Sequence, residues 1–155
     1  MKTDLNVMTI NELTKYIEYK HHGCLRANLP KISELLYTVL TTHGQNYREL
    51  FEVYSLFGQL SALLEQHLFK EETFLFHRFG HQETSEIAKD ILREHDRTRH
   101  ILTRLKDITN NYKTEESPCS IHEEAFRLLN DVTNDIYIHF YLEESILLKE
   151  YVENG

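Results

Sequence analysis

The chain has 155 residues, a formal net charge of -8, and only two Pro, five Gly and two Cys. This length suits a single domain, residues 1–155, and the surplus of carboxylates excludes a phosphate-binding surface, so we expect no nucleic-acid partner. Two cysteines are too few for a disulfide framework, and no apolar run is long enough for a signal peptide or a membrane span, so we expect a cytoplasmic protein without a membrane partner.

The first predicted helix begins at Thr9, which can form a capping box with Glu12. One side of this helix is lined by Ile10, Leu13, Ile17 and one of two adjacent histidines, His21 or His22. Pro30 has no amide hydrogen and disfavours helix at the residue before it, so we expect a kink or a short break there. The apolar spacing then resumes and stops near Gly44.

The second predicted helix runs from about Tyr47 to Arg78, with Gly80 as its end. Its apolar side steps by four, three, four and three residues through Leu60, Leu64, His67, Glu71 and Phe74. Two polar residues that can bind metal therefore occupy positions where a helical bundle normally places leucine.

The third predicted helix runs from about Glu83 to Asn110, and His95 interrupts its apolar stripe. A polar loop from Asn111 to Ser117 follows, closed by Pro118.

The fourth predicted helix runs to about Tyr151, and Ser120 with Glu123 offers a capping box at its start. Its apolar side repeats the earlier spacing through Val132, Ile136, His139, Glu143 and Ile146. Four long helices with short connections predict an all-α, up-down-up-down four-helix bundle with a kinked or broken first helix.

The polar residues on the four apolar sides predict a metal site. A buried charge without a partner is unfavourable by several kcal/mol, which a domain with a net stability of about 5–15 kcal/mol cannot absorb at several positions. Cations would turn these charges into ligands. The predicted ligands are His22 (or His21), His67, Glu71, His95, His139 and Glu143. The remaining histidines, which include His43, His77, His81, His100 and His122, fit no such spacing, and we expect them on the solvated surface.

Imidazole and carboxylate ligands without a thiolate favour iron, manganese or zinc. If both glutamates bridge two ions, each ion has two histidines and two carboxylate oxygens, and a bridging oxo or hydroxo group adds a fifth ligand. Iron then keeps an open position for O2, NO or peroxide, whereas structural zinc normally closes at four ligands.

The residues around these ligands resemble the hemerythrin-like family and, within it, the di-iron repair-of-iron-centres (RIC) proteins, from about Ile10 to Tyr151. The resemblance lies in four segments: His22 followed by Arg26 and Leu29-Pro30, Gln66 to Glu72, Glu94-His95-Asp96, and His139 to Glu143. Alignment on the Leu-Pro step favours His22 over His21. The resemblance implies one hemerythrin-like di-iron domain with two Fe ions in an oxo- or hydroxo-bridged centre, and with Glu71 and Glu143 as bridges.

The sequence also departs from patterns seen in this family. Oxygen-carrying hemerythrins are expected to have a second histidine four residues after the third-helix ligand, where this chain has Arg99, and this favours the RIC branch. We expect no N-terminal cysteine-pair domain of the kind many RIC proteins have. Leu63 stands where some of them have an acidic residue, whereas Glu94 keeps a carboxylate beside His95. Cys24 is either a thiol used in redox chemistry near His22 or a small buried side chain.

The resemblance implies a role in repairing iron-sulfur clusters damaged by nitrosative or oxidative stress, through iron donation or NO handling. The implied partners are NO, O2 or peroxide as small ligands, and damaged iron-sulfur proteins or a cluster scaffold. The alternatives are an O2- or NO-binding storage or sensor module, a di-iron enzyme that reduces NO or reacts with peroxide, and a bundle stabilised by structural zinc.

Overall fold

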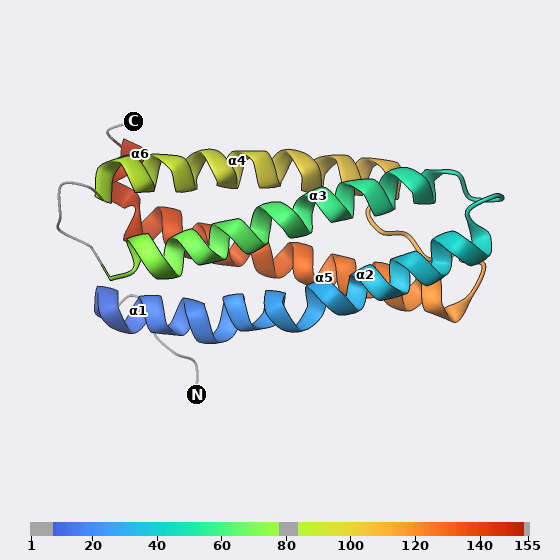
Figure 1. The fold of residues 1–155 in the computed structure, drawn as a ribbon, viewed down its shortest axis with the longest axis horizontal. Coiled ribbons are helices and arrows are strands. Elements are labelled where there is room, and N and C mark those ends of the chain that lie inside the picture. Colours follow the sequence, from blue (N-terminus) through green and yellow to red (C-terminus); the bar gives the residue numbers. More distant parts are fainter. Residues whose placement is uncertain (1–7, 78–83, 154–155) are drawn as a thin grey trace.

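The computed structural model describes residues 8–77 and 84–153, and all of the regular structure in these ranges is helical. Four long helical arms lie side by side and run in alternating directions along the chain (Figure 1), which confirms the predicted all-α bundle. The arms consist of α1 (Ile10–Tyr16) continuing into α2 (Gly23–His43), α3 (Glu49–Lys70), α4 (Thr84–Ile108), and α5 (Ser120–Leu142) followed by the short α6 (Lys149–Glu153). The contacts α2–α3, α3–α4 and α2–α5 join neighbouring arms.

The first arm is bent but unbroken. The predicted capping box is confirmed, because the Glu12 amide donates to Thr9 Oγ1 and the Thr9 amide donates to Glu12 Oε2, both at 3.1 Å. Pro30 lies inside the continuous α2, and Figure 1 shows the arm changing direction along its length. The helix continues past Pro30 because buried Leu29 and Ile32 pack into the core on either side of it.

Within residues 8–77 and 84–153, three of the four arms contain a π-helical turn, in residues Ile17–His22, Glu71–Leu75 and Glu143–Leu147. In such a turn an amide donates to the carbonyl five residues earlier, as Phe76 does to Glu71 at 2.8 Å. The additional residue shifts the helix register. Leu75 and Leu147 are therefore buried, whereas the predicted core residue Phe74 is 38% exposed and Ile146 is only half-buried. After Glu71 and after Glu143, the buried apolar residue thus lies one position later in the sequence than predicted.

Two apolar clusters form the core, and a polar layer separates them. The larger cluster includes Leu25, Leu68, Leu102 and Phe140, and the smaller cluster includes Leu13, Ile17, Leu75, Ile91 and Leu147. On every arm, the predicted ligands fall between residues of one cluster and residues of the other. Apolar side chains therefore close the polar layer from both ends.

Some predicted helix ends differ from the structure. Ile10 is 48% exposed because it lies at the first position of α1, before the helix reaches the core. Ser120 is the first residue of α5 rather than its cap, and the cap position belongs to Cys119, which has no side-chain capping bond. The fourth arm does not continue unbroken to Tyr151, because Leu148 leaves the helical conformation with φ -107° and ψ 11°.

The loop predicted from Asn111 to Ser117 is confirmed as non-helical. Asn110, Asn111 and Tyr112 have positive φ values of 51°, 61° and 60°. Tyr112 is held in this conformation because its amide donates to Thr109 Oγ1 at 2.9 Å and its buried hydroxyl hydrogen-bonds Thr133 Oγ1 at 2.9 Å.

The predicted helix limits at Arg78, Gly80 and Glu83 lie outside the described residues. Of the helices that the structure describes, none combines the length and apolar character needed to cross a lipid bilayer.

Candidate metal centre

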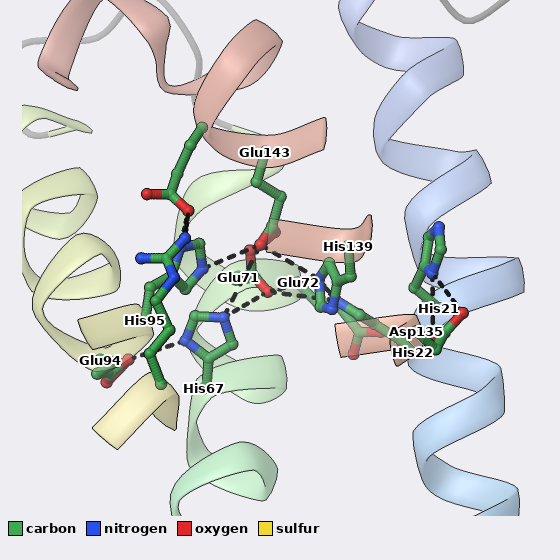
Figure 2. Close-up of polar contacts among 12 residues, drawn as sticks. His21, His22, His67, Glu71, Glu72, Glu94, His95, Asp135, His139 and Glu143 are labelled. Carbon is green, nitrogen blue, oxygen red and sulfur yellow. Dashed lines mark hydrogen bonds and ion pairs between the residues drawn. The ribbon is translucent and has the colours of Figure 1, made fainter. Parts of the chain in front are cut away.

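All six predicted ligands point into the polar layer at the middle of the bundle (Figure 2). His22 comes from the first arm, His67 and Glu71 come from the end of α3 and the turn after it, His95 comes from α4, and His139 and Glu143 come from the end of α5 and the turn after it. Each of these side chains is at most 1% exposed. The structure therefore brings together the complete predicted set from four separate arms.

Glu71 lies among three histidines. Its Oε1 atom is 2.9 Å from Nε2 of His67, 3.2 Å from Nε2 of His22 and 3.6 Å from Nε2 of His139. These histidines belong to three different arms, so a single carboxylate connects most of the cluster.

Glu143 has the corresponding place on the other side of the cluster. Its Oε1 atom is 3.1 Å from Nε2 of His95, 3.2 Å from Nε2 of His139 and 3.9 Å from Nε2 of His67. Both glutamates thus contact histidines on opposite sides of the bundle axis.

The cluster divides into two groups that can each hold a metal ion, with ligand atoms within 4.8 Å of one another in each group. Position A consists of His22, His139, Glu71 and Glu143. Position B consists of His67, His95, Glu71 and Glu143. Both carboxylates belong to both positions, which is the arrangement required for two carboxylate-bridged ions.

Buried polar atoms without partners show that the residues fit such ions. Glu71 Oε2 and Glu143 Oε2 are buried and accept no hydrogen bond from the described residues. A buried carboxylate oxygen that is left unsatisfied is unfavourable, and a bound ion is one of the ways in which proteins satisfy such an atom. Two cations between the carboxylates would satisfy both oxygens.

The protonation of these groups also suits metal binding. Burial lowers the pKa of His139 to about 4 and also lowers the pKa of His95, so both rings are neutral and have a lone pair to donate. Burial opposes ionisation of Glu71, but the charge of His67 and the surrounding histidine hydrogen bonds outweigh it and hold the pKa of Glu71 well below its usual range. Burial likewise opposes protonation of His67, but Glu71 and Glu94 raise its pKa to about 9. A cation would therefore replace a proton on His67.

An outer set of carboxylates faces Nδ1 of three of the histidines. His22 Nδ1 donates to Glu72 Oε1 at 3.1 Å, and Arg26 holds Glu72 through two hydrogen bonds of 2.7 Å and 2.5 Å. A carboxylate in this position fixes the tautomer and the orientation of a ligating histidine and increases its basicity.

His67 and His95 have similar support. His67 Nδ1 donates to Glu94 Oε1 at 3.2 Å, and Lys70 holds Glu94 at 2.9 Å. His95 Nδ1 lies 3.3 Å from Glu144 Oε2, a contact that is not aligned as a hydrogen bond, and Arg99 pairs with Glu144.

No role in supporting the ligands was predicted from the sequence for Glu72, Glu144, Arg26 or Arg99. The signal was present as a repeat: His-x-x-x-Arg on the first and third arms, and His-x-x-x-Glu-Glu on the second and fourth arms. The first glutamate of each pair joins the cluster, and the second supports a histidine from a neighbouring arm.

His139 differs from the other three histidines. Its Nδ1 atom is buried and has no hydrogen-bond partner among the described residues. Its ring lies parallel to the ring of His21, with the centroids 5.5 Å apart. His21, the alternative first ligand, is itself buried, hydrogen-bonds Asp135 through Nδ1 at 3.1 Å and belongs to neither position.

The other predicted surface histidines give a mixed result. His77 and His100 are exposed and His43 is half-buried, whereas His81 lies outside the described residues. The prediction for His122 was wrong, because its ring is only 7% exposed. The reason is local: His122 Nδ1 hydrogen-bonds Ser117 Oγ at 2.6 Å, and its ring packs 4.1 Å from the Phe126 ring.

Both cysteines are free and half-buried. Burial and then the negative charge of Asp135 raise the pKa of the Cys24 thiol. Since the thiolate is the reactive form of cysteine, this environment disfavours thiol chemistry at Cys24.

This chain is similar to several known proteins. The family described as the Hemerythrin HHE cation binding domain matches residues 16–151. The iron-sulfur cluster repair protein ScdA of Staphylococcus epidermidis is 20% identical over 92% of this chain. The iron-sulfur cluster repair protein DnrN of Neisseria gonorrhoeae is 24% identical over 90% of this chain. The iron-sulfur cluster repair protein YtfE of Yersinia pestis is 27% identical over 93% of the chain.

The alignments cover 67% of the length of ScdA, 66% of YtfE and 89% of DnrN. The match to the family extends over all four helical arms and includes every residue of positions A and B. The chain therefore belongs to the hemerythrin HHE cation-binding family.

Proposed function

We propose that positions A and B hold two iron ions bridged by Glu71 and Glu143, and that the protein acts in the repair of iron-sulfur clusters damaged by nitrosative or oxidative stress. The observation that carries this proposal is that two buried four-residue groups share both of their carboxylates. The similar proteins are named iron-sulfur cluster repair proteins, and this supports the proposed function.

The ligand atoms favour iron. Each position offers two imidazole nitrogens and two carboxylate oxygens without a thiolate, a set that suits iron. Iron commonly takes five or six ligands, so four protein ligands leave room for a small molecule, whereas structural zinc closes at four. When bound, iron would supply one-electron chemistry and affinity for NO, O2 or peroxide.

The protein residues hold and shield the ions in this proposal. Glu72, Glu94 and Glu144 orient the histidines, and the apolar clusters at both ends of the polar layer exclude water. The protein would work in the cytoplasm, where damaged iron-sulfur proteins or a cluster scaffold would receive iron or be protected from NO.

Reconstitution tests this function. Purified protein loaded with iron is mixed with an iron-sulfur enzyme inactivated by NO, and the recovery of enzyme activity and the consumption of NO are measured in parallel. We expect recovery, NO consumption, or both. Glu71→Ala, which removes a ligand from both positions, should abolish the effect, and His43→Ala should keep it. Neither recovery nor NO consumption by the loaded protein would refute the proposal.

The reversible carrier or sensor function has less support. Arg99 stands where an oxygen carrier is expected to have a further histidine, and its guanidinium pairs with Glu144 and lies 5.5 Å from the centre of the Phe140 ring. Reversible O2 uptake by the reduced protein, followed by stopped-flow spectroscopy, would favour the carrier. Catalytic turnover of NO or peroxide would instead favour an enzyme.

A further inference from the structure

The two metal positions are related by an approximate two-fold repeat in the chain. The repeat pairs His22 with His95 and His67 with His139, and it pairs the two bridging glutamates with each other. The outer residues follow the same repeat, since Glu72 with Arg26 corresponds to Glu144 with Arg99. Any difference between positions A and B must therefore arise where the repeat fails.

The repeat fails at the residues that support His67 and His139. Glu94 directly precedes His95, and the corresponding residue before His22 is His21. Lys70 lies three residues after His67, and the corresponding residue after His139 is the buried Leu142.

As a result, position A has one supporting carboxylate fewer than position B. His67 Nδ1 donates to Glu94, which Lys70 holds, whereas His139 Nδ1 has no hydrogen-bond partner in the part of the chain that the structure describes. Both histidines of position B thus face a paired carboxylate, whereas at position A His22 alone does so among the described residues.

The surroundings of the two positions differ in the same direction. A phenylalanine ring stacks on one ligand at each position, and the stacking is closer at position B: the Phe140 and His95 ring centroids are 3.7 Å apart, whereas those of Phe76 and His22 are 5.7 Å apart. Next to position A, the polar pair His21 and Asp135 lies beyond His139, on the side away from His95 (Figure 2). The carboxylate side chains beside position A, Glu72 and Asp135, are 25% and 19% exposed. Beside position B, Glu144 is 23% exposed but Glu94 only 7% exposed, so position A has more partly exposed polar groups around it.

We propose that the ion at position A is the exchangeable iron of this protein and that the ion at position B is retained. This inference rests on the proposed di-iron centre. Loss of a carboxylate that supports a ligating histidine typically weakens metal binding by about 10–100-fold. Among the described residues, position A has no such carboxylate at His139, so it should release its ion about tenfold faster than position B, or more.

Chelator kinetics test this difference without reference to repair activity. The apoprotein is loaded anaerobically with Fe(II) to two ions per chain, and release to a coloured Fe(II) chelator is followed with time. We expect two phases of equal amplitude, with rate constants that differ by about tenfold or more. Release of both ions in a single phase would overturn the inference while leaving the proposed function intact, whereas failure to bind any iron would overturn both.

Two variants assign the phases. Glu94→Gln removes the carboxylate from His67 and should accelerate the slow phase towards the fast one. His21→Glu places a carboxylate at the position that corresponds to Glu94 and should slow the fast phase. Glu86→Gln, which removes the charge of an 82% exposed residue on α4, is the matched control and should change neither phase. No effect of Glu94→Gln on the slow phase would overturn the assignment, even if His21→Glu failed to fold.

Crystallography gives a second, direct reading. Crystals of the loaded protein are treated with chelator until half of the iron is removed, and anomalous diffraction data are collected at the iron absorption edge. We expect the remaining peak beside His67 and His95. A stronger peak beside His22 and His139 would overturn the inference.

Discussion

Replacing Glu71 with alanine should remove both ions at once, because Glu71 belongs to positions A and B. A ligand that binds only the folded state at about 100 times its dissociation constant stabilises that state by about 2.7 kcal/mol, so two ions contribute about 5 kcal/mol. For a chain of this size, about 1 kcal/mol corresponds to about 2–4 °C in melting temperature. Iron should therefore raise the melting temperature of the wild-type protein by about 10–20 °C and that of Glu71→Ala hardly at all.

The assay compares iron content after desalting with anaerobic thermal unfolding, followed by far-ultraviolet circular dichroism with and without Fe(II). His95→Ala removes a ligand from position B alone, so it should keep about half of the iron-dependent stabilisation. His43→Ala changes a half-buried histidine outside both positions and should behave like the wild type. Wild-type iron content in Glu71→Ala would refute the proposed bridge.

Three further substitutions test the support around the site and the loop. Arg99→Leu removes the cation paired with Glu144 and should weaken iron binding at position B about 10-fold or more, as measured by competition with a chelator. Unchanged affinity would contradict the role of Arg99 in holding Glu144. Phe140→Ala removes a fully buried ring and should lower the free energy of unfolding by about 3–5 kcal/mol in denaturant titrations; a loss below about 1 kcal/mol would contradict its role in packing. Burial raises the pKa of Tyr112 to about 12 from 10.0, so the wild type should lose stability as the pH rises from about 10 to about 12. Tyr112→Phe should abolish that loss of stability, and identical pH profiles of the two proteins would contradict the role of Tyr112.

Periodicity in the sequence predicted the helical bundle well, because each arm buries apolar residues at helical spacing on both sides of the polar layer. The same spacing placed His67, Glu71, His139 and Glu143 towards the core, where the structure has them. Their role as iron ligands remains a prediction. The choice of His22 over His21 did not follow from spacing alone, since the π-helical turn Ile17–His22 buries both residues.

Predictions from the sequence were wrong where local structure overrides helical periodicity. Phe74 was expected in the core because regular α-helical spacing was extended through Glu71–Leu75, but the π-helical turn buries Leu75 instead. His122 was expected at the surface because Ser117 reaches it only through the turn that precedes α5, and Phe126, one helical turn further along α5, then covers its ring.

The π-helical turns at Glu71 and Glu143 have a consequence for how relatives of this chain should be aligned. Each turn accommodates one additional residue locally, so a relative that lacks this residue can continue the α-helix and keep its later side chains on the same faces of the helix. A relative without one residue of Glu71–Leu75 would therefore still bury the counterparts of Leu75 and Phe76 in the smaller apolar cluster. A homologue without a π-helical turn should therefore align with a one-residue gap after the glutamate, and an alignment without that gap would pair its buried residues with exposed residues of this chain.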